Sequence, residues 1–304
     1  MGTFRESDVA IGDGPGALHG SLLRAVSPSV REPVLILPGS GPTDRDGNSP
    51  AGITAQPYRL LALGLAGQGV TSLRVDKRGV GASAAAASSE SGITIGTFAA
   101  DARNQARELR SLTGARCVWL LGHSEGSIHA LLAAQDNDRI CGLILVSPVG
   151  RKMGDILREQ LIANPANAPV LDEASRIIAS LEAGRPVSGD SINPVLLPLF
   201  RPAIQPFLIS MLAVDPPSLL RSFRGPVMVV QGTTDLQTSP DDAERLARAR
   251  AGVRLEIIDG MNHVLKDAPA DRAANFAAYS DPDRPLSATL VPLVSDFIRK
   301  HSRQ

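Results

Sequence analysis

The chain has 304 residues, 43% of them hydrophobic, which is enough to bury a core in one large domain or two small ones. Its 31 basic and 31 acidic residues give a formal net charge of zero, so nothing in the charge balance indicates a nucleic acid or an anionic membrane surface as a partner. No apolar run reaches membrane-spanning length, and the first residues are too polar for a signal peptide. We therefore expect a cytoplasmic protein.

The two cysteines, Cys117 and Cys141, each begin an apolar run that is typical of a buried strand. A disulfide framework is not expected in so long a chain with so few cysteines. Both residues are therefore predicted to be buried, reduced thiols.

The first 112 residues alternate between strand and helix patterns. Residues 8–26 hold two short apolar runs around a Gly/Pro turn, which predicts an antiparallel hairpin at a sheet edge. Continuous apolar runs at 33–38 and 71–75 are typical of strands that are buried on both faces. Helices are expected over 56–67 and 94–112.

A central stretch carries the strongest motif. An apolar run ends in Gly122-His123-Ser124-Glu125-Gly126, and a helix-forming run follows. The pattern G-x-S-x-G between a strand and a helix is that of a nucleophile elbow, in which the serine sits at the apex of a strained turn. The glycines on either side remove clashes with the strand and the helix. An ordinary strand–turn–helix with a serine in it could carry the same five residues, so the motif needs partners elsewhere.

A second loop could assist the serine. Pro38-Gly39-Ser40-Gly41-Pro42-Thr43-Asp44-Arg45-Asp46-Gly47-Asn48 follows the buried strand at 33–38 and is rich in residues that expose backbone N–H groups. We predict that the N–H groups of Ser40 and Glu125 form an oxyanion hole. The charged and amide side chains of the loop are expected to form an internal network, although Arg45 could instead contact substrate.

The strand rhythm breaks after a further strand at 141–147. Residues 150–224 show no strand pattern but contain helical segments, near 156–163, 169–181 and 194–212. We predict that they form a helical cap over the carboxyl edge of the sheet; the alternative is extra helices packed on the core. Strand and helix patterns then resume at 225–232, 240–250, 253–258 and 290–301.

These patterns predict an α/β fold. Strands that alternate with helices form a mostly parallel sheet with helices on both faces. The core domain is expected to comprise residues 1–149 and 225–304, with the cap, residues 150–224, inserted between them.

Two polar residues join the serine at the ends of predicted strands. Asp235 follows the strand at 225–232, and His263 follows the strand at 253–258. The carboxyl ends of parallel strands meet at one edge of a sheet, where ligands bind. A serine hydroxyl needs a base to take its proton, an imidazole suits that role near neutral pH, and a carboxylate can orient the imidazole. We predict a catalytic triad of Ser124, Asp235 and His263.

Other polar residues near these strand ends fit structural roles better. Asp241 and Asp242 lie in the first turn of a predicted helix, where they complement its dipole. Asp259 is expected in a turn, His123 should point away from the serine, and His129 is expected to be packed or solvent-facing on the helix after the elbow.

The chain resembles the α/β-hydrolases of the serine esterase and peptidase type. The elbow, the order Ser124, Asp235, His263 and the Pro38–Asn48 loop carry the resemblance, which covers nearly the whole chain. The loop is similar to that of a bacterial subgroup usually described as esterases, although Pro38 stands where many members have histidine. The resemblance implies hydrolysis of carboxylic esters through an acyl-enzyme, with no metal and no cofactor.

Three hypotheses remain for the activity. The first is a carboxylesterase for short- to medium-chain acyl esters of small molecules, with the apolar cap as the acyl pocket. The second is an aminopeptidase or amidase, which needs an anion for the substrate amine; the cap offers Asp155, Glu159, Asp172, Glu173 and Glu182. The third is a non-catalytic ligand receptor on the same fold. A dehalogenase would need aspartate in place of Ser124.

Overall fold

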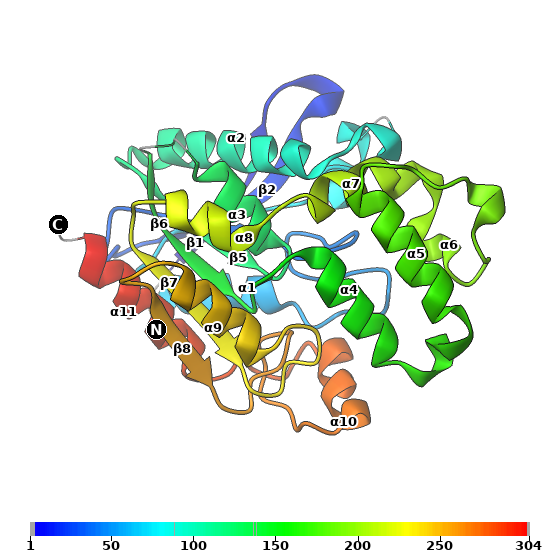
Figure 1. Ribbon diagram of the computed structural model, residues 1–304. Helices are drawn as coiled ribbons and strands as arrows, with labels where there is room; N and C mark the ends of the chain where they lie inside the picture. Colours follow the sequence, from blue (N-terminus) through cyan, green and yellow to red (C-terminus); the bar gives the residue numbers. More distant parts are fainter. Residues whose placement is uncertain (1–3, 88, 136, 138, 303–304) are drawn as a thin grey trace.

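The computed structural model describes residues 4–87, 89–135, 137 and 139–302. One eight-stranded sheet runs through the molecule between two layers of helices (Figure 1). Its strands are β1 (Phe4–Ile11), β2 (Leu18–Ala25), β3 (Val34–Leu37), β4 (Ser72–Val75), β5 (Val118–His123), β6 (Ile140–Val146), β7 (Val227–Gly232) and β8 (Arg254–Ile258).

The sheet has the order β1-β2-β4-β3-β5-β6-β7-β8. The six strands from β4 to β8 along this order are parallel, whereas β1 pairs antiparallel with β2 and β2 pairs antiparallel with β4. The predicted edge hairpin and the mostly parallel sheet are both confirmed. The carboxyl ends of β3, β5, β7 and β8 consequently meet at one edge.

Helices cover both faces of the sheet. The helices α1 (Pro57–Gly67) and α11 (Leu290–Ser302) pack on one face, and α2 (Ile95–Thr113), α3 (Gly126–Ala133) and α9 (Pro240–Ala249) pack on the other. Each face has its own cluster of buried apolar side chains, and the central strands contribute to both.

The strand β3 shows how the sequence builds these two clusters. Val34 and Ile36 join the cluster under α1 and α11, while Leu35 and Leu37 join the cluster under α2 and α3. Successive side chains of a strand point to opposite faces, so a strand covered on both sides needs an unbroken apolar run.

The segment between β6 and β7 is helical. Its helices are α4 (Met153–Ile162), α5 (Leu171–Glu182), α6 (Leu197–Phe200), α7 (Gln205–Leu212) and α8 (Pro216–Ser222). No strand occurs in it, and every residue of this segment is described. In Figure 1, α4, α5 and α6 lie to one side of the sheet, away from both chain termini. We call α4 to α7 the insertion, because α8 packs instead on α3 and α9, with Leu220 buried in the core.

The insertion holds its own apolar cluster, which includes Met153, Ile177, Phe200, Leu208 and Met211. The prediction of one helical segment over 194–212 is wrong in one respect: the segment is divided into α6, a 3-10 turn at Pro202–Ile204 and α7. A proline lacks the N–H that would continue the helix, and the residue before it is pushed toward an extended conformation, as Arg201 is here.

One short helix, α10 (Arg272–Ala277), lies between β8 and α11 and was not predicted. It has six residues, of which only Asn275 is buried, so it carries no apolar periodicity that a sequence pattern could reveal.

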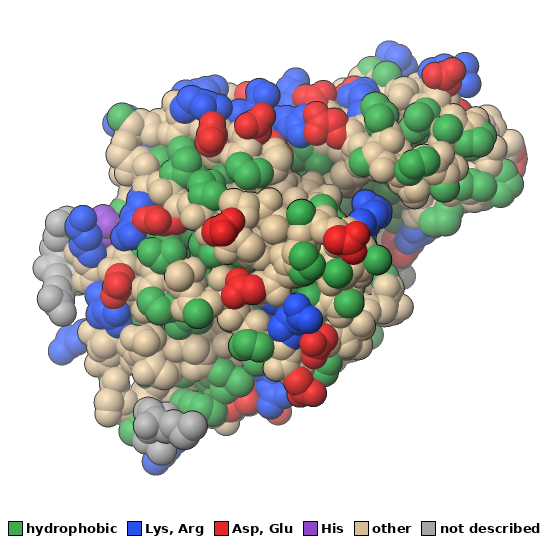
Figure 2. Space-filling view, turned by 90° about the horizontal axis from the view of Figure 1, so that it is seen from below, with side chains coloured by type: hydrophobic (Ala, Val, Ile, Leu, Met, Phe, Trp, Pro, Cys, Tyr) green, Lys and Arg blue, Asp and Glu red, His purple; other side chains and the backbone are tan. Residues whose placement is uncertain are grey.

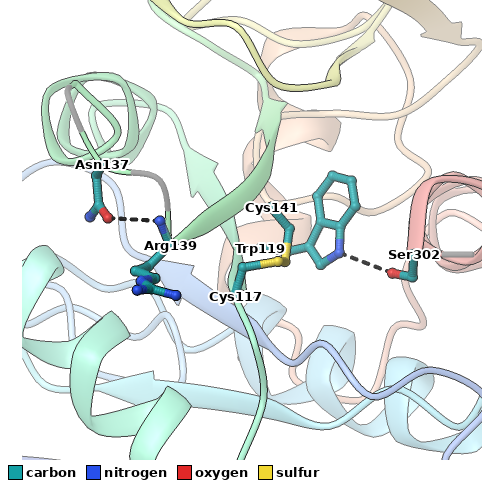
Figure 3. Close-up of a disulfide and its surroundings, with 6 residues drawn as sticks. All are labelled: Cys117, Trp119, Asn137, Arg139, Cys141 and Ser302. Atoms are coloured by element: carbon teal, nitrogen blue, oxygen red, sulfur yellow. Dashed lines mark hydrogen bonds between the residues drawn. A yellow bond between two sulfur atoms is a disulfide. The ribbon is translucent and has the colours of Figure 1, made fainter. Parts of the chain in front are cut away.

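The two cysteines form a disulfide, so the prediction of reduced thiols is wrong. Figure 3 shows the Cys117–Cys141 bond joining the start of β5 to β6 beside the ring of Trp119. The cysteines are 24 positions apart in sequence, but the pairing of β5 with β6 brings their Cα atoms to 5.2 Å. Counting cysteines could not reveal this, because the pair depends on which strands are neighbours.

Figure 2 shows a face on which acidic and basic side chains are interspersed among hydrophobic ones, with a lobe projecting on the side where Figure 1 places α4 to α6. In the described part of the chain, no single helix is both long and apolar enough to cross a membrane. One bent pair, Leu197–Leu212 with Pro216–Ser222, meets the test for length and composition, but its apolar side chains belong largely to the buried clusters.

Candidate active site

Ser124 occupies the tight turn between β5 and α3. Its backbone has a φ of +53°, in the left-handed region that side chains rarely adopt, and its N–H donates to the carbonyl of Val146 at 3.0 Å. A methyl group at Gly122 would lie 2.3 Å from the Gly126 carbonyl oxygen, and one at Gly126 would lie 2.3 Å from the Leu37 carbonyl oxygen. Both flanking glycines are therefore required by backbone contacts of the turn.

Asp235 and His263 are brought together from the loops after β7 and β8. The Nδ1 atom of His263 lies 2.9 Å from Oδ2 and 3.0 Å from Oδ1 of Asp235. Burial alone would raise the pKa of Asp235, but the positive charge that His263 can carry and its hydrogen bond outweigh burial and lower the pKa to about 2. With Nδ1 donating to this carboxylate, the neutral imidazole keeps Nε2 free to accept a proton.

Four further donors hold the Asp235 carboxylate. Oδ1 accepts from the backbone N–H groups of Gln237 at 2.8 Å and Thr238 at 3.1 Å. Oδ2 accepts from the Thr238 hydroxyl and from the Gln231 amide, each at 3.2 Å. Gln231 and Thr238 were not predicted as partners of Asp235. Gln231 could have been recognised, because it is a polar residue inside an otherwise apolar strand.

His123 links the elbow to the loop that carries His263. Its Nε2 atom lies 2.8 Å from the carbonyl oxygen of His263, and its Nδ1 lies 2.8 Å from the hydroxyl of Tyr58, which accepts from the Gly39 N–H at 2.9 Å. A carbonyl can only accept, so Nε2 of His123 donates and Nδ1 accepts from Tyr58. Burial, aided by the nearby charge of His263, lowers the pKa of His123 to about 3.

This row of hydrogen bonds, which we call the polar chain, runs from Gly39 through Tyr58 and His123 to His263. It connects the Pro38–Asn48 loop, which we call the oxyanion loop after its predicted role, to the elbow and to the loop of His263. The expectation that His123 points away from the serine agrees with these contacts, but its bridging role was not predicted.

The two predicted oxyanion donors lie beside the serine. Ser40, Ser124 and Glu125 line the same cavity, and a methyl group at Gly39 would lie 3.3 Å from the Ser124 Cβ atom. Within the described residues, neither the Ser40 N–H nor the Glu125 N–H donates a hydrogen bond. Two uncommitted backbone donors beside a serine are what a tetrahedral oxyanion needs.

The rest of the oxyanion loop forms the internal network expected from its sequence. Asp44 accepts from the N–H groups of Asp46 at 2.9 Å and Asn48 at 2.8 Å. Arg45 donates to Asp76 at 2.9 Å. Burial would raise the pKa of that carboxyl, but its hydrogen bonds, above all those from Arg45, lower it. Because the Arg45 side chain is bonded to Asp76, it braces the loop.

The cavity at Ser124 has a volume of ≈ 700 Å³ and opens between the sheet edge and the insertion. Apolar side chains from α2 and from the insertion line much of it, among them Phe98, Met153, Leu199, Phe207 and Met211. Ser124 is only 7% exposed, so a molecule that reaches it must enter this cavity.

The match to known families covers most of the chain. A model of the alpha/beta hydrolase family matches residues 34–279. The chain belongs to the alpha/beta hydrolase family. No curated protein sequence matches this hydrolase.

Solved structures share the fold of this hydrolase at low sequence identity. Est1E from Butyrivibrio proteoclasticus with bound ferulic acid aligns with a TM-score of 0.62 and 16% identity over 97% of this chain and 100% of its own. The esterase Pf2001 from Pyrococcus furiosus aligns with a TM-score of 0.58 and 16% identity over 98% and 93% of the two chains. A thermophilic esterase from Thermogutta terrifontis, with malate bound, aligns with a TM-score of 0.57 and 18% identity over 98% of this chain and 99% of its own. At these identities the likeness supports the fold alone.

The other polar residues that the sequence places near these strand ends have structural roles in the hydrolase. Asp242 completes a capping box with Ser239 at the start of α9, and Asp241 lies in the same turn, as expected. Asp259 accepts from the Thr233 hydroxyl at 2.9 Å, in a turn. His129 is buried in α3 and stacks on Phe98, with 5.1 Å between ring centroids.

Proposed function

We propose that this hydrolase is a serine carboxylesterase with Ser124 as nucleophile, His263 as general base and acid, and Asp235 as the group that orients His263. The observation that supports this most is the hydrogen-bonded pair of Asp235 and His263. The backbone carbonyl of His263 also accepts a hydrogen bond from His123, the residue before Ser124. A serine hydrolase also needs donors for the oxyanion. The N–H groups of Ser40 and Glu125, which have no hydrogen-bond partner among the described residues, lie beside the serine and could serve this role.

The reaction would proceed in two halves. Ser124 Oγ attacks the ester carbonyl carbon while Nε2 of His263 takes its proton, and the Ser40 and Glu125 N–H groups stabilise the oxyanion. The tetrahedral intermediate then expels the alcohol, which leaves with the proton from His263. Water attacks the acyl-enzyme in the same way, the carboxylic acid departs, and Ser124 regains its proton.

We propose that the insertion, with α8 outside it, acts as a cap that supplies the acyl pocket. The predicted cap of residues 150–224 would then end before α8, and α8 would join the predicted core of residues 1–149 and 225–304. Of the core, residues 1–3, 88, 136, 138 and 303–304 lie outside the described residues. The apolar lining suits short- to medium-chain acyl groups of small-molecule esters.

The acidic residues of the insertion do not favour an aminopeptidase. Glu159 is bonded to Arg151, Glu182 to Arg158 and Glu173 to the Asn193 N–H. The two acidic side chains that line the cavity are also paired, Glu90 with Arg201 and Glu125 with Lys77. A substrate amine would have to displace a cation from one of these pairs.

An activity series separates the hypotheses. p-Nitrophenyl esters from acetate to octanoate, assayed beside alanine and proline p-nitroanilides, should show ester turnover that Ser124→Ala removes. Turnover of the anilides alone would establish an amidase instead. Tight binding of an ester with turnover of neither series would establish a receptor.

The predicted cytoplasmic location stays untested. The Cys117–Cys141 disulfide argues for an oxidising compartment instead, because glutathione and thioredoxin keep most cytosolic thiols reduced. Fractionation of the source cells, with thiol alkylation before lysis, would decide between the two.

A further inference from the structure

We propose that Lys77 is a positioning residue that holds both oxyanion donors, an inference that rests on the proposed esterase function. Lys77 lies in the loop after β4, and only 7% of its side chain is exposed. Its ammonium group donates to the carbonyl oxygen of Gly39 at 2.9 Å and to Oε1 of Glu125 at 3.2 Å. One cation thus contacts both segments that supply an oxyanion N–H.

The first contact sets the direction of the Ser40 N–H. The Gly39 carbonyl and the Ser40 N–H belong to the same peptide group, and in a trans peptide the two point in opposite directions. When Lys77 holds the carbonyl on one side, the N–H must point to the other. The Gly39 N–H, which belongs to the preceding peptide group, donates to Tyr58 at 2.9 Å, so both peptide groups on either side of the Gly39 Cα atom are held by hydrogen bonds.

The second contact restrains the Glu125 backbone. Glu125 supplies the other N–H, and its side chain, which is 3% exposed, reaches Lys77. Burial would raise the pKa of Glu125, but the charge of Lys77, together with the neighbouring His129, outweighs burial and lowers the pKa to about 2, so the carboxylate stays ionised. His129 lies 3.4 Å from the same oxygen without forming a hydrogen bond, and burial lowers its pKa.

Lys77 lines the cavity, but two of its three N–H donors are already bonded to the segments that carry the oxyanion donors. Its Nζ atom also lies 4.9 Å from the centroid of the Phe98 ring, within the range of a cation–π contact. The residue therefore acts through the peptide groups that it holds.

A purely structural role is the competing explanation. Removing one member of a buried ion pair leaves the other charge unpaired, which destabilises a protein whatever the pair does. The test must therefore separate loss of folding stability from loss of transition-state stabilisation.

Three variants allow this separation. Lys77→Met keeps the aliphatic stem but loses the charge and the donors, Lys77→Met/Glu125→Gln also removes the unpaired carboxylate while keeping the Glu125 N–H, and Lys77→Arg keeps a cationic donor. Each is assayed for kcat and KM on the best p-nitrophenyl ester, for thermal stability, and for inhibition by a trifluoromethyl ketone, whose serine adduct carries an oxyanion.

We expect kcat to fall ~10- to 100-fold in Lys77→Met with KM nearly unchanged, since a misdirected donor costs less than the ~100- to 1,000-fold of a deleted one. Trifluoromethyl ketone affinity should fall by a similar factor. The double variant should regain stability but stay slow, and Lys77→Arg should recover part of kcat.

A matched control is Arg250→Met. Arg250 is a partly buried cation between α9 and β8 that also donates to backbone carbonyls. Its acceptors, Phe223 and Gly225, precede β7, at the opposite end of that strand from Asp235. This control should lose stability while kcat is retained.

Two outcomes would overturn the proposal. Full kcat in Lys77→Met, or recovery of kcat together with stability in the double variant, would show that the pair is only structural. A wild-type protein that hydrolyses no ester would remove the esterase function itself, and with it this role for Lys77.

Discussion

The sheet edge and the insertion position their side chains in different ways. At the sheet edge, backbone groups approach each other so closely that Gly122 and Gly126 leave no room for a methyl group. In the insertion, short interrupted helices are held by an aliphatic cluster and by ion pairs at its surface. Packed apolar side chains tolerate replacements of similar volume, whereas a methyl group pressed against a backbone carbonyl cannot be accommodated. We therefore expect changes at the edge to remove activity or folding, and changes in the insertion to alter substrate choice.

The largest effect is expected at Ser124. Ser124→Ala should lower kcat for p-nitrophenyl esters by at least ~1,000-fold, because the other groups keep only the catalysis of the oxyanion hole and of binding. Circular dichroism and thermal melting should show an intact fold. Near wild-type turnover in this variant would remove Ser124 from the mechanism.

The second effect tests the close backbone contact at the elbow. Gly126→Ala places a methyl group against the Leu37 carbonyl and should cost ~3 kcal/mol or more in free energy of unfolding, together with activity. Gly67→Ala is the matched control, since nothing lies near that position in α1, and alanine should be neutral or stabilising there. Denaturant unfolding of both variants measures the difference; equal stabilities would contradict the packing argument.

The disulfide should matter for stability and little for catalysis. Cys117→Ser/Cys141→Ser opens a loop of 24 positions and should lower the free energy of unfolding by ~3 kcal/mol. The bond lies at the end of β5 opposite Ser124, so kcat/KM should change little. A large loss of kcat/KM in a folded variant would show that the bond also positions the elbow.

The buried His123 should make stability depend on pH. Its pKa in the folded protein is about 3, below the ~6.5 of an unfolded chain, so the unfolded state binds more protons in between and stability falls as pH falls from 6.5 toward 3. Over the interval from pH 6.5 to 5 this loss is ~2 kcal/mol. His123→Gln should be less stable at pH 7 but show a shallower decline, whereas His19→Gln, on β2 outside the polar chain, should keep the wild-type decline. Unfolding measured at several pH values tests both.

The smallest effect is expected in the insertion. Phe207→Ala enlarges the cavity and removes an edge contact with Phe98, at 5.8 Å between ring centroids. The ratio of kcat/KM for octanoate to that for butyrate should rise by ~10-fold, the scale of a small change in an apolar pocket. Val195→Ala, at a position 68% exposed and outside the cavity lining, should leave the ratio unchanged. An unchanged ratio in Phe207→Ala would place the acyl chain elsewhere.

The sequence was informative where a local pattern determines the structure. The elbow glycines, the apolar strands and the polar residues after them specify the sheet edge, and the structure brings Asp235 and His263 into contact. Their roles with Ser124 stay a prediction. The residues that connect the site were not predictable, because Tyr58, Lys77 and His123 acquire partners only when β3, β4 and β5 lie side by side. The Cys117–Cys141 disulfide was not predicted for the same reason, because it depends on the pairing of β5 with β6.

The polar chain has a consequence for which base can serve the reaction. The rings of His123 and His263 lie side by side near the elbow, with 4.8 Å between their centroids. In the polar chain, Gly39 donates to Tyr58, Tyr58 donates to Nδ1 of His123, and Nε2 of His123 donates to the His263 carbonyl. Both nitrogens of His123 are therefore bonded, so its ring cannot accept the serine proton. Of these two rings, only His263 keeps a nitrogen that is free of partners among the described residues, as the proposed general base requires.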